Sequence, residues 1–194
     1  FPLLDKFPAM ITNKLYLSGF ATVALISSAA SADVTISFTG LTLAGYQFAE
    51  AITPGQIAGT LTGATINVEM TNSFWFTKAN DLTLYMDVAP LSTGGLLQIG
   101  GAVNTGAAER RAWPTGGGLF STTSTGRVDL DNAIDLANHP TMSFWVGNGR
   151  ESYIASGTWT GSIVLHGVSL VGVPSPGALA LLAVSGIVAR RRRA

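Results

Sequence analysis

Apolar and polar residues alternate along most of the chain between residues 33 and 172, with a period of two. Five runs show this alternation and two shorter apolar runs accompany it: residues 34–38, 64–70, 82–88, 127–130, 159–165, 96–99 and 142–146. A period of two places one row of side chains on a buried face and the other row toward solvent, as in a half-buried β-strand. We therefore expect at least seven strands.

Glycine-rich clusters separate these runs, at residues 53–55, 92–95, 115–118, 147–149 and 156–157. Glycine supplies the positive φ that tight turns need. No window carries a helical period, because the nearest candidate, residues 44–57, contains Pro54. Short strands with regular turns predict an all-β fold with a single β-sandwich, which we expect to be jelly-roll-like. Its first and last strands, near Val34 and Ile163, are expected to pair or to be neighbours.

Residues 10–32 have the three parts of a secretory signal peptide. Lys14 supplies the positive start, residues 15–26 form an apolar run, and Ala30 and Ala32 form an Ala-x-Ala cleavage site. A buried core helix, the alternative, would need one polar face, which this run lacks. We expect a signal helix here and cleavage by signal peptidase after Ala32.

The other end of the chain combines prolines, an apolar run and arginines. Pro174 and Pro176 end the domain before them, because proline cannot extend a central strand. Residues 177–189 carry no charge and precede a block of arginines. A helix of that length spans roughly 20 Å at about 1.5 Å per residue, against roughly 30 Å of hydrocarbon. We expect a short transmembrane helix whose basic end stays cytoplasmic.

This tail resembles the PEP-CTERM sorting signal of Gram-negative bacteria. The residues that match its motif are Val173, Pro174, Ser175, Pro176, Arg190, Arg191, Arg192 and Arg193. Ser175 stands where the family usually has glutamate. The resemblance implies export through the inner membrane, recognition by a membrane exosortase, and removal of the tail, followed by release or attachment at the cell surface. The alternative is an ordinary C-terminal transmembrane anchor.

Residues 79–86, 94–100 and 156–163 are similar in pattern to the P-domain of proprotein convertases, which is a jelly roll. Such modules accompany protease domains and are not catalytic. The resemblance therefore implies a fold for the body of the chain and no activity.

Composition narrows the classes of function. Between residues 33 and 172 the chain has ten acidic and five basic residues, a net charge of −5, which argues against a nucleic-acid partner. The absence of cysteine excludes disulfides, thiolate zinc sites and cysteine nucleophiles. Low overall charge and abundant glycine are typical of an extracellular β-rich domain.

One acidic cluster could bind a metal: Asp129, Asp131 and Asp135, with an asparagine between them. Carboxylate and amide oxygens are ligands that calcium prefers, although the glycine turn and distal glutamate of an EF-hand are missing. The alternative is a solvated strand end. His139 and His166 lack metal-ligand spacing.

Catalytic arrangements have no local support in the sequence. No Gly-x-Ser-x-Gly elbow is present, but a serine, histidine and aspartate triad can assemble from distant residues. Glu69, Glu109 and Glu151 could supply a carboxylate pair for glycoside hydrolysis.

The tryptophans suggest another activity. Trp75 lies between two phenylalanines and Trp113 lies in a glycine-rich loop, so both are candidates to stack on sugar rings. Core packing is the alternative, and we assign Trp145 and Trp159 to the core.

These observations divide the chain into residues 1–9 (upstream sequence or a fragment edge), 10–32 (signal), 33–172 (β-sandwich) and 173–194 (sorting or anchor segment). The leading hypothesis is an exported, non-enzymatic protein of the cell surface or extracellular matrix, without a cofactor. The first alternative is a module that binds extracellular polysaccharide, assisted by calcium. The second is a secreted hydrolase.

Overall fold

The computed structural model describes residues 23–27, 33–91 and 95–172. These residues form strands and two short 3₁₀ turns, η1 (Ala79–Asp81) and η2 (Leu136–Asn138). Within these ranges, no helix has the length and apolar character needed to cross a membrane. Ala30 and Ala32 of the expected cleavage site, and the whole sorting motif from Val173 to Arg193, lie outside the described residues.

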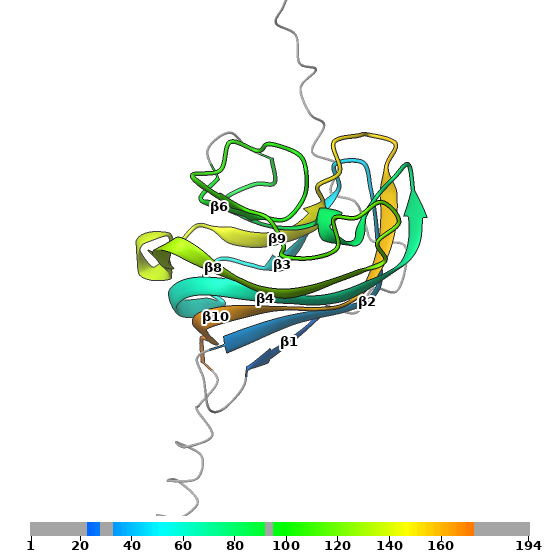
Figure 1. Cartoon of the computed structure of the whole chain (residues 1–194). Helices are drawn as coiled ribbons and strands as arrows, with labels where there is room; N and C mark the ends of the chain where they lie inside the picture. The colour runs from blue at the N-terminus through cyan, green and yellow to red at the C-terminus, as the bar shows by residue number, and fades with distance from the viewer. Residues whose placement is uncertain (1–22, 28–32, 92–94, 173–194) are drawn as a thin grey trace, which may run out of the picture.

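Two five-stranded sheets face each other (Figure 1). The first sheet has the order β1 (Val23–Ser27), β2 (Asp33–Ala44), β10 (Ser156–Leu170), β4 (Ile57–Phe74), β8 (Thr123–Asp135). The second has the order β3 (Phe48–Ile52), β9 (Ser143–Asn148), β5 (Leu82–Asp87), β6 (Leu97–Ile99), β7 (Glu109–Arg111). Only β6 and β7 pair in parallel among these strands, and every other pair is antiparallel.

Among the described strands, the chain changes sheet at six of nine connections, and only β1–β2, β5–β6 and β6–β7 stay within one sheet. Each loop that changes sheet crosses the sandwich at one of its two ends. We call the tip the end that carries the loops of residues 45–47, 75–81, 112–122 and 149–155. The base is the opposite end, where β2 begins and β10 ends.

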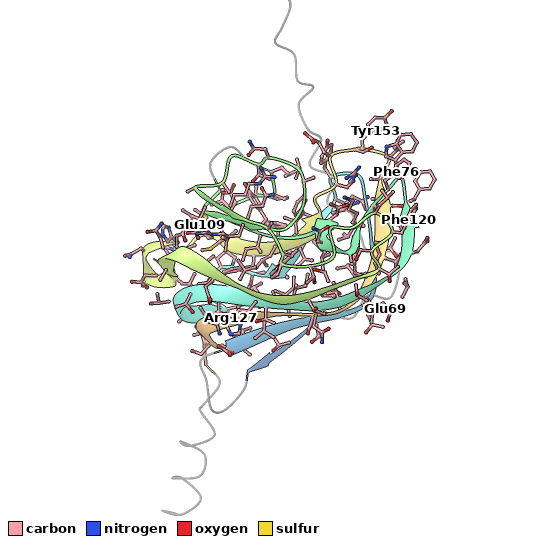
Figure 2. All side chains as sticks on the ribbon, in the orientation of Figure 1. Glu69, Phe76, Glu109, Phe120, Arg127 and Tyr153 are labelled. Atoms are coloured by element: carbon pink, nitrogen blue, oxygen red, sulfur yellow. The ribbon has the colours of Figure 1, made fainter. Side chains whose placement is uncertain are left out.

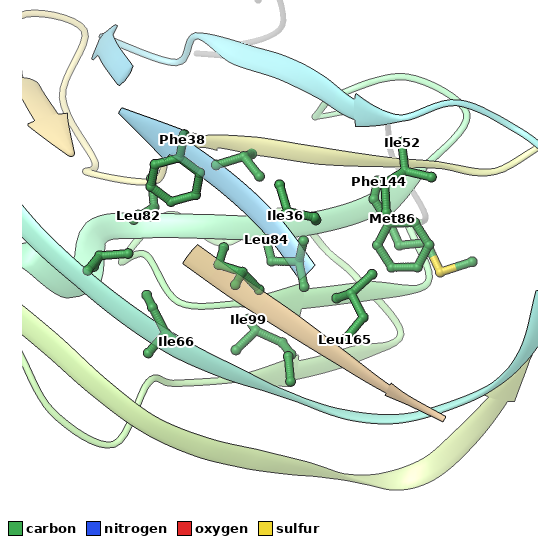
Figure 3. Packing of buried hydrophobic residues seen from close by; sticks show 14 of the residues in the cluster. Ile36, Phe38, Ile52, Ile66, Leu82, Leu84, Met86, Ile99, Phe144 and Leu165 are labelled. Carbon is green, nitrogen blue, oxygen red and sulfur yellow. The ribbon is translucent and has the colours of Figure 1, made fainter. Parts of the chain in front are cut away.

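Alternating side chains of both sheets form one core (Figure 3). Ile36, Ile66 and Leu165 contribute to it from the first sheet, and Leu84 and Phe144 from the second; all are buried. β5 is buried on both faces, and Gly101 lies against the Thr83 side chain on its outer face. Residues 100–105 also fold back over β6, where Gln98 Nε2 donates to the backbone oxygens of Gly100 and Val103. The period of two in the sequence therefore reflects the burial of alternate side chains in this core, as expected.

The predicted all-β sandwich is confirmed, and so is the pairing of its first and last strands. Val34 lies opposite Leu165, and Ile36 lies opposite Ile163. Residues 44–57 contain no helix, and their middle forms β3. The sequence did not indicate β7, which has three residues and pairs in parallel with β6.

The N-terminal side differs from the expectation at one place. Val23–Ser27, placed in the apolar helix of the signal, is a strand that pairs antiparallel with β2, with Ser27 opposite Val34. A short apolar run that contains valine and isoleucine suits an edge strand as well as a helix, so periodicity alone does not separate the two. The rest of the expected signal helix lies outside the described residues.

Candidate functional site

Large apolar side chains are exposed mainly at the tip. In the described part of the chain, nine large hydrophobic residues are exposed, and seven of them lie there: Phe74, Trp75, Phe76, Leu119, Phe120, Tyr153 and Ile154. We call these seven residues the aromatic tip. Apolar surface concentrated in this way marks an interaction site more often than scattered apolar residues do.

The first turn joins β4 to η1. Trp75 and Phe76 both have positive φ, 55° and 56°, and their side chains are 50% and 58% exposed. Two consecutive residues of positive φ are what a type I′ turn requires, and Asn-Gly normally occupies them. The left-handed conformation costs about 1–2 kcal/mol for each residue with a side chain. The hydroxyl of Thr77 donates to Phe74 O (2.7 Å), and that of Ser73 donates to Thr77 O (2.7 Å), which holds the turn closed.

The second turn has Leu119 and Phe120 at its centre. Ser121 N donates to Gly118 O at 3.0 Å, which closes a four-residue β-turn. Phe120 has a φ of 72° at the third position, where a type II turn prefers glycine. Its side chain is 82% exposed. A bulky aromatic residue therefore again occupies a position that suits glycine.

The third turn has Tyr153 and Ile154 at its centre. Ala155 N donates to Ser152 O at 3.3 Å and closes the turn just before β10. The side chain of Tyr153 is 81% exposed. Turn centres are usually occupied by glycine, proline, asparagine, aspartate or serine, so three turns with apolar centres at one end of a domain are unusual.

Hydrogen bonds hold the three turns beside one another. Ala79 N, just after the first turn, donates to Ser121 O at 3.1 Å, and Lys78 Nζ donates to Gly117 O at 2.8 Å. Ser156, just after the third turn, pairs with Phe74. Figure 2 shows the side chains labelled Phe76, Phe120 and Tyr153 projecting from the same end of the molecule. The aromatic tip is therefore one surface.

Few charges are free at the tip. Asp81 is buried beneath the first turn, where its Oδ2 accepts from Lys78 N at 2.8 Å. Burial raises the pKa of the Asp81 carboxyl, while the hydrogen bond from Lys78 and the charge of Arg150 act in the opposite direction. The surface is thus apolar and close to neutral.

Trp113, a candidate sugar contact in the sequence, is a core residue, which is the alternative that the sequence also allowed. It is only 4% exposed, and its Nε1 donates to Leu82 O at 2.7 Å. Gly100 makes room for the indole, because a Cβ there would collide with the ring. Of the two tryptophans predicted for the core, Trp159 is fully buried, while Trp145 is partly buried and donates to Asp87 O at 3.1 Å.

The structure does not bring the three acids of the expected calcium site together. Asp129 pairs with Arg127 at 2.7 Å, and Asp131 pairs with Arg111, which raises the pKa of that guanidinium. Asp135 caps η2 by accepting from Ala137 N. Each of the three carboxylates therefore has a different partner. No cluster of three metal-ligating side chains occurs in residues 23–27, 33–91 and 95–172.

One histidine cluster resembles a catalytic triad in its order. Thr65 Oγ1 lies 2.7 Å from His166 Nε2, and His166 Nδ1 donates to Asp33 Oδ2 at 3.1 Å. The cluster lies on the outer face of the first sheet, at the base, where Gly167 N also donates to Asp33. Triad catalysis further needs donors for an oxyanion. The backbone around Thr65 is instead paired with β8 and β10, so we assign the cluster to linking β2, β4 and β10.

The remaining sites named from the sequence are scattered. Glu109 accepts from Arg111 Nε and from Asp131 N, and Glu69 lies on β4 near the tip. His139 lines an apolar pocket of about 240 Å³ at the base, beneath the 300 Å³ at which ligand pockets typically begin. Neither carboxylate pairing nor histidine ligation arises from these positions.

Sequence reasoning identified Trp75 but missed its partners on the other two turns. The available signal was an apolar pair between turn-forming residues, as in Gly-Leu-Phe-Ser at residues 118–121 and Ser-Tyr-Ile-Ala at residues 152–155. No protein-family model, curated protein or solved structure matches this chain. The site must therefore be interpreted from its own geometry.

Proposed function

We propose that this chain is an exported, non-enzymatic β-sandwich protein, sorted to the cell surface by its PEP-CTERM-like tail. The observation that carries the proposal is the position of both ends of the sandwich. Asp33 begins β2 and pairs with His166 near the end of β10, so the sandwich enters and leaves at the base. A tail that follows Gly172 would hold the domain by this end and leave the aromatic tip facing away.

We further propose that the sandwich is a jelly roll. The strand orders β2-β10-β4-β8 and β3-β9-β5-β6 are those expected when a chain with two Greek keys folds into two sheets. The P-domain-like pattern of the sequence supports the same topology. In this interpretation β1 is an additional edge strand, and removal of the signal after Ala32 would leave β2 at the edge of the first sheet.

The proposal is tested by following both ends of the full-length chain in a Gram-negative host, with and without an exosortase. We expect the processed protein to begin at Asp33, and to lose the arginine block only when exosortase is present. Replacement of the four terminal arginines by serine should leave the tail uncut. Arg127→Ser, which changes an exposed arginine of the sandwich, is the matched control. A protein that stays in the cytoplasm with residues 10–32 intact would contradict the proposal.

A further inference from the structure

We propose that the aromatic tip binds a neutral polysaccharide, with Trp75, Phe76 and Tyr153 stacked on its sugar rings. The inference deepens the proposed function, because a surface protein held at its base meets the polymers around the cell with its tip. It names the class of ligand and the residues that contact it. Four properties of the tip lead to it.

The first property is backbone strain: the exposed side chains occupy turn positions that favour glycine or asparagine. Six of the seven residues of the aromatic tip occupy the centres of three β-turns, and Trp75, Phe76 and Phe120 have positive φ. Asparagine or glycine would relieve the backbone at these positions. Backbone strain of this kind clusters at ligand-binding sites. We therefore expect these aromatic rings to contact a ligand.

The second property is the combination of flat rings with hydroxyl groups. Ser73, Ser121 and Ser152 flank the exposed rings, and each hydroxyl retains hydrogen-bonding capacity beyond its contact within the protein. A sugar presents an apolar face of C–H groups edged by hydroxyls, so it needs both kinds of partner. A purely apolar ligand would leave the hydroxyls unused.

The third property is charge. The charged residues of the described tip loops are Lys78 and Arg150, which are basic, and Asp81 and Glu151, which are acidic, so the two signs are balanced. The sandwich as a whole carries a net charge of −5. This charge would repel acidic polysaccharides and anionic lipid surfaces. A neutral polymer fits best.

The fourth property is position. β10 runs from the tip to the base over 15 residues, roughly 45 Å of strand at about 3.3 Å per residue. A membrane that holds the chain beyond Gly172 would thus lie at the far end from the aromatic tip. The rings are spread over three adjacent turns, which suits a polymer that passes over successive rings.

The binding test uses the full 194-residue chain in mild detergent, with affinity electrophoresis through gels that contain mixed-linkage β-glucan, galactomannan or dextran. We expect retardation by at least one of these neutral polymers. Trp75→Ala and Tyr153→Ala should each weaken binding by about tenfold or more, as central aromatic contacts do. Val88→Ala is the matched control, because Val88 is similarly exposed (54%) but lies at the base. It should bind like the unmodified chain, and all three variants should keep its melting temperature.

Tryptophan fluorescence gives a second readout of the same contact. Trp75 is half exposed, whereas Trp113 and Trp159 are buried and Trp145 is partly buried, so Trp75 is the tryptophan of residues 33–172 that is most open to quenching by acrylamide. The retarding polymer should protect this fraction from acrylamide. Trp75→Phe should remove the protected fraction and retain most of the retardation.

Three results would overturn the inference: no retardation by any of the three polymers, retardation unchanged in both alanine variants, or binding that appears only with phosphatidylcholine vesicles or as self-association in sedimentation. These measurements are made on purified protein and do not depend on where the chain is sorted. If binding holds but the tail is never cut, the proposed sorting fails and the aromatic tip remains a polysaccharide site. If the tail is cut but no polymer binds, only this inference fails.

Discussion

At the base of the sandwich, polar side chains hydrogen-bond the start of β2 to the end of β10, whereas at the tip, large apolar side chains are exposed to solvent. Asp33 accepts from His166 Nδ1 and from Gly167 N, so the start of β2 is tied to the end of β10. Val171 N continues this closure by donating to Gln56 O at 2.9 Å. At the tip, hydrogen bonds of similar length close turns whose central residues are Trp75, Phe76 and Phe120.

The difference between the two ends cannot come from folding requirements alone. Both ends are made of short loops that connect the same strands, and glycine, asparagine or serine would serve the tip as well as they serve other turns. The described base loops carry one non-glycine residue of positive φ, Leu91 with a φ of 56°, whereas the tip turns carry three, Trp75, Phe76 and Phe120. The exposed rings at the tip are therefore evidence of a contact that the isolated fold does not supply.

The largest effect that tests this comparison is expected at Trp113, which lies under the tip in the core. Trp113→Ala should lower the free energy of unfolding by about 3–5 kcal/mol, because it leaves a cavity and an unpaired Leu82 O. Trp75→Ala should change it by less than about 1 kcal/mol, since Trp75 is half exposed. Urea unfolding of both variants measures the contrast. Equal losses would mean that Trp75 is also structural.

The second effect is a gain in stability at the tip. Replacing Trp75 and Phe76 together by asparagine and glycine should raise the free energy of unfolding by about 2 kcal/mol, because Asn-Gly adopts the positive φ values with little strain. The same variant should lose polysaccharide binding. Thermal unfolding, with Val88→Ala as the control, checks the gain. A destabilised variant would show that the rings hold the turn together and would remove the argument from strain.

The third effect is a loss of stability at the base. Asp33→Ala removes the acceptor for His166 and Gly167 and should lower the free energy of unfolding by about 1–2 kcal/mol. Thr35→Ala, on the same face of β2, is the control. Amide hydrogen exchange should accelerate at Gly167 and leave the tip unchanged. Faster exchange at Phe74 as well would mean that the two ends are coupled.

The strands were predictable from the sequence because burial of one face imposes a period of two on runs such as residues 64–70 and 159–165. The site was not, because tertiary contacts decide which aromatic residues are exposed. Trp75 and Trp113 look equivalent in the sequence, beside loop-forming residues. Only the fold shows that the indole of Trp113 packs against Gly100 and Leu82 O, while Trp75 stays half exposed.

The acidic cluster teaches the same lesson about charge. Asp129 and Asp131 lie two residues apart, which suggested that they bind one metal ion together. Each instead forms an ion pair with an arginine, Asp129 with Arg127 of β8 and Asp131 with Arg111 of β7. Arg111 belongs to β7, the strand that the sequence did not indicate. Predicting whether carboxylates form a metal site therefore requires knowing which side chains the neighbouring strands place beside them. The residue pattern of a single strand does not give this information.

The smallest effect concerns the buried pair of Tyr85 and Asp87, and it is measured as a dependence of stability on pH. Burial and the neighbouring Asp87 raise the pKa of Tyr85 to about 12, and its hydroxyl donates to Asp87 Oδ2 at 3.1 Å. The folded chain therefore keeps this proton at a pH where the unfolded chain releases it, so stability should fall as pH rises from about 10 to about 12. Tyr85→Phe should cost about 1 kcal/mol at pH 7 through the lost hydrogen bond, and it should flatten the fall in that range. Urea midpoints at pH 7, 10 and 11 measure both effects. If the variant loses stability as steeply as the unmodified chain between pH 10 and 11, another group governs the alkaline transition and the contrast between a satisfied base and an open tip loses this support.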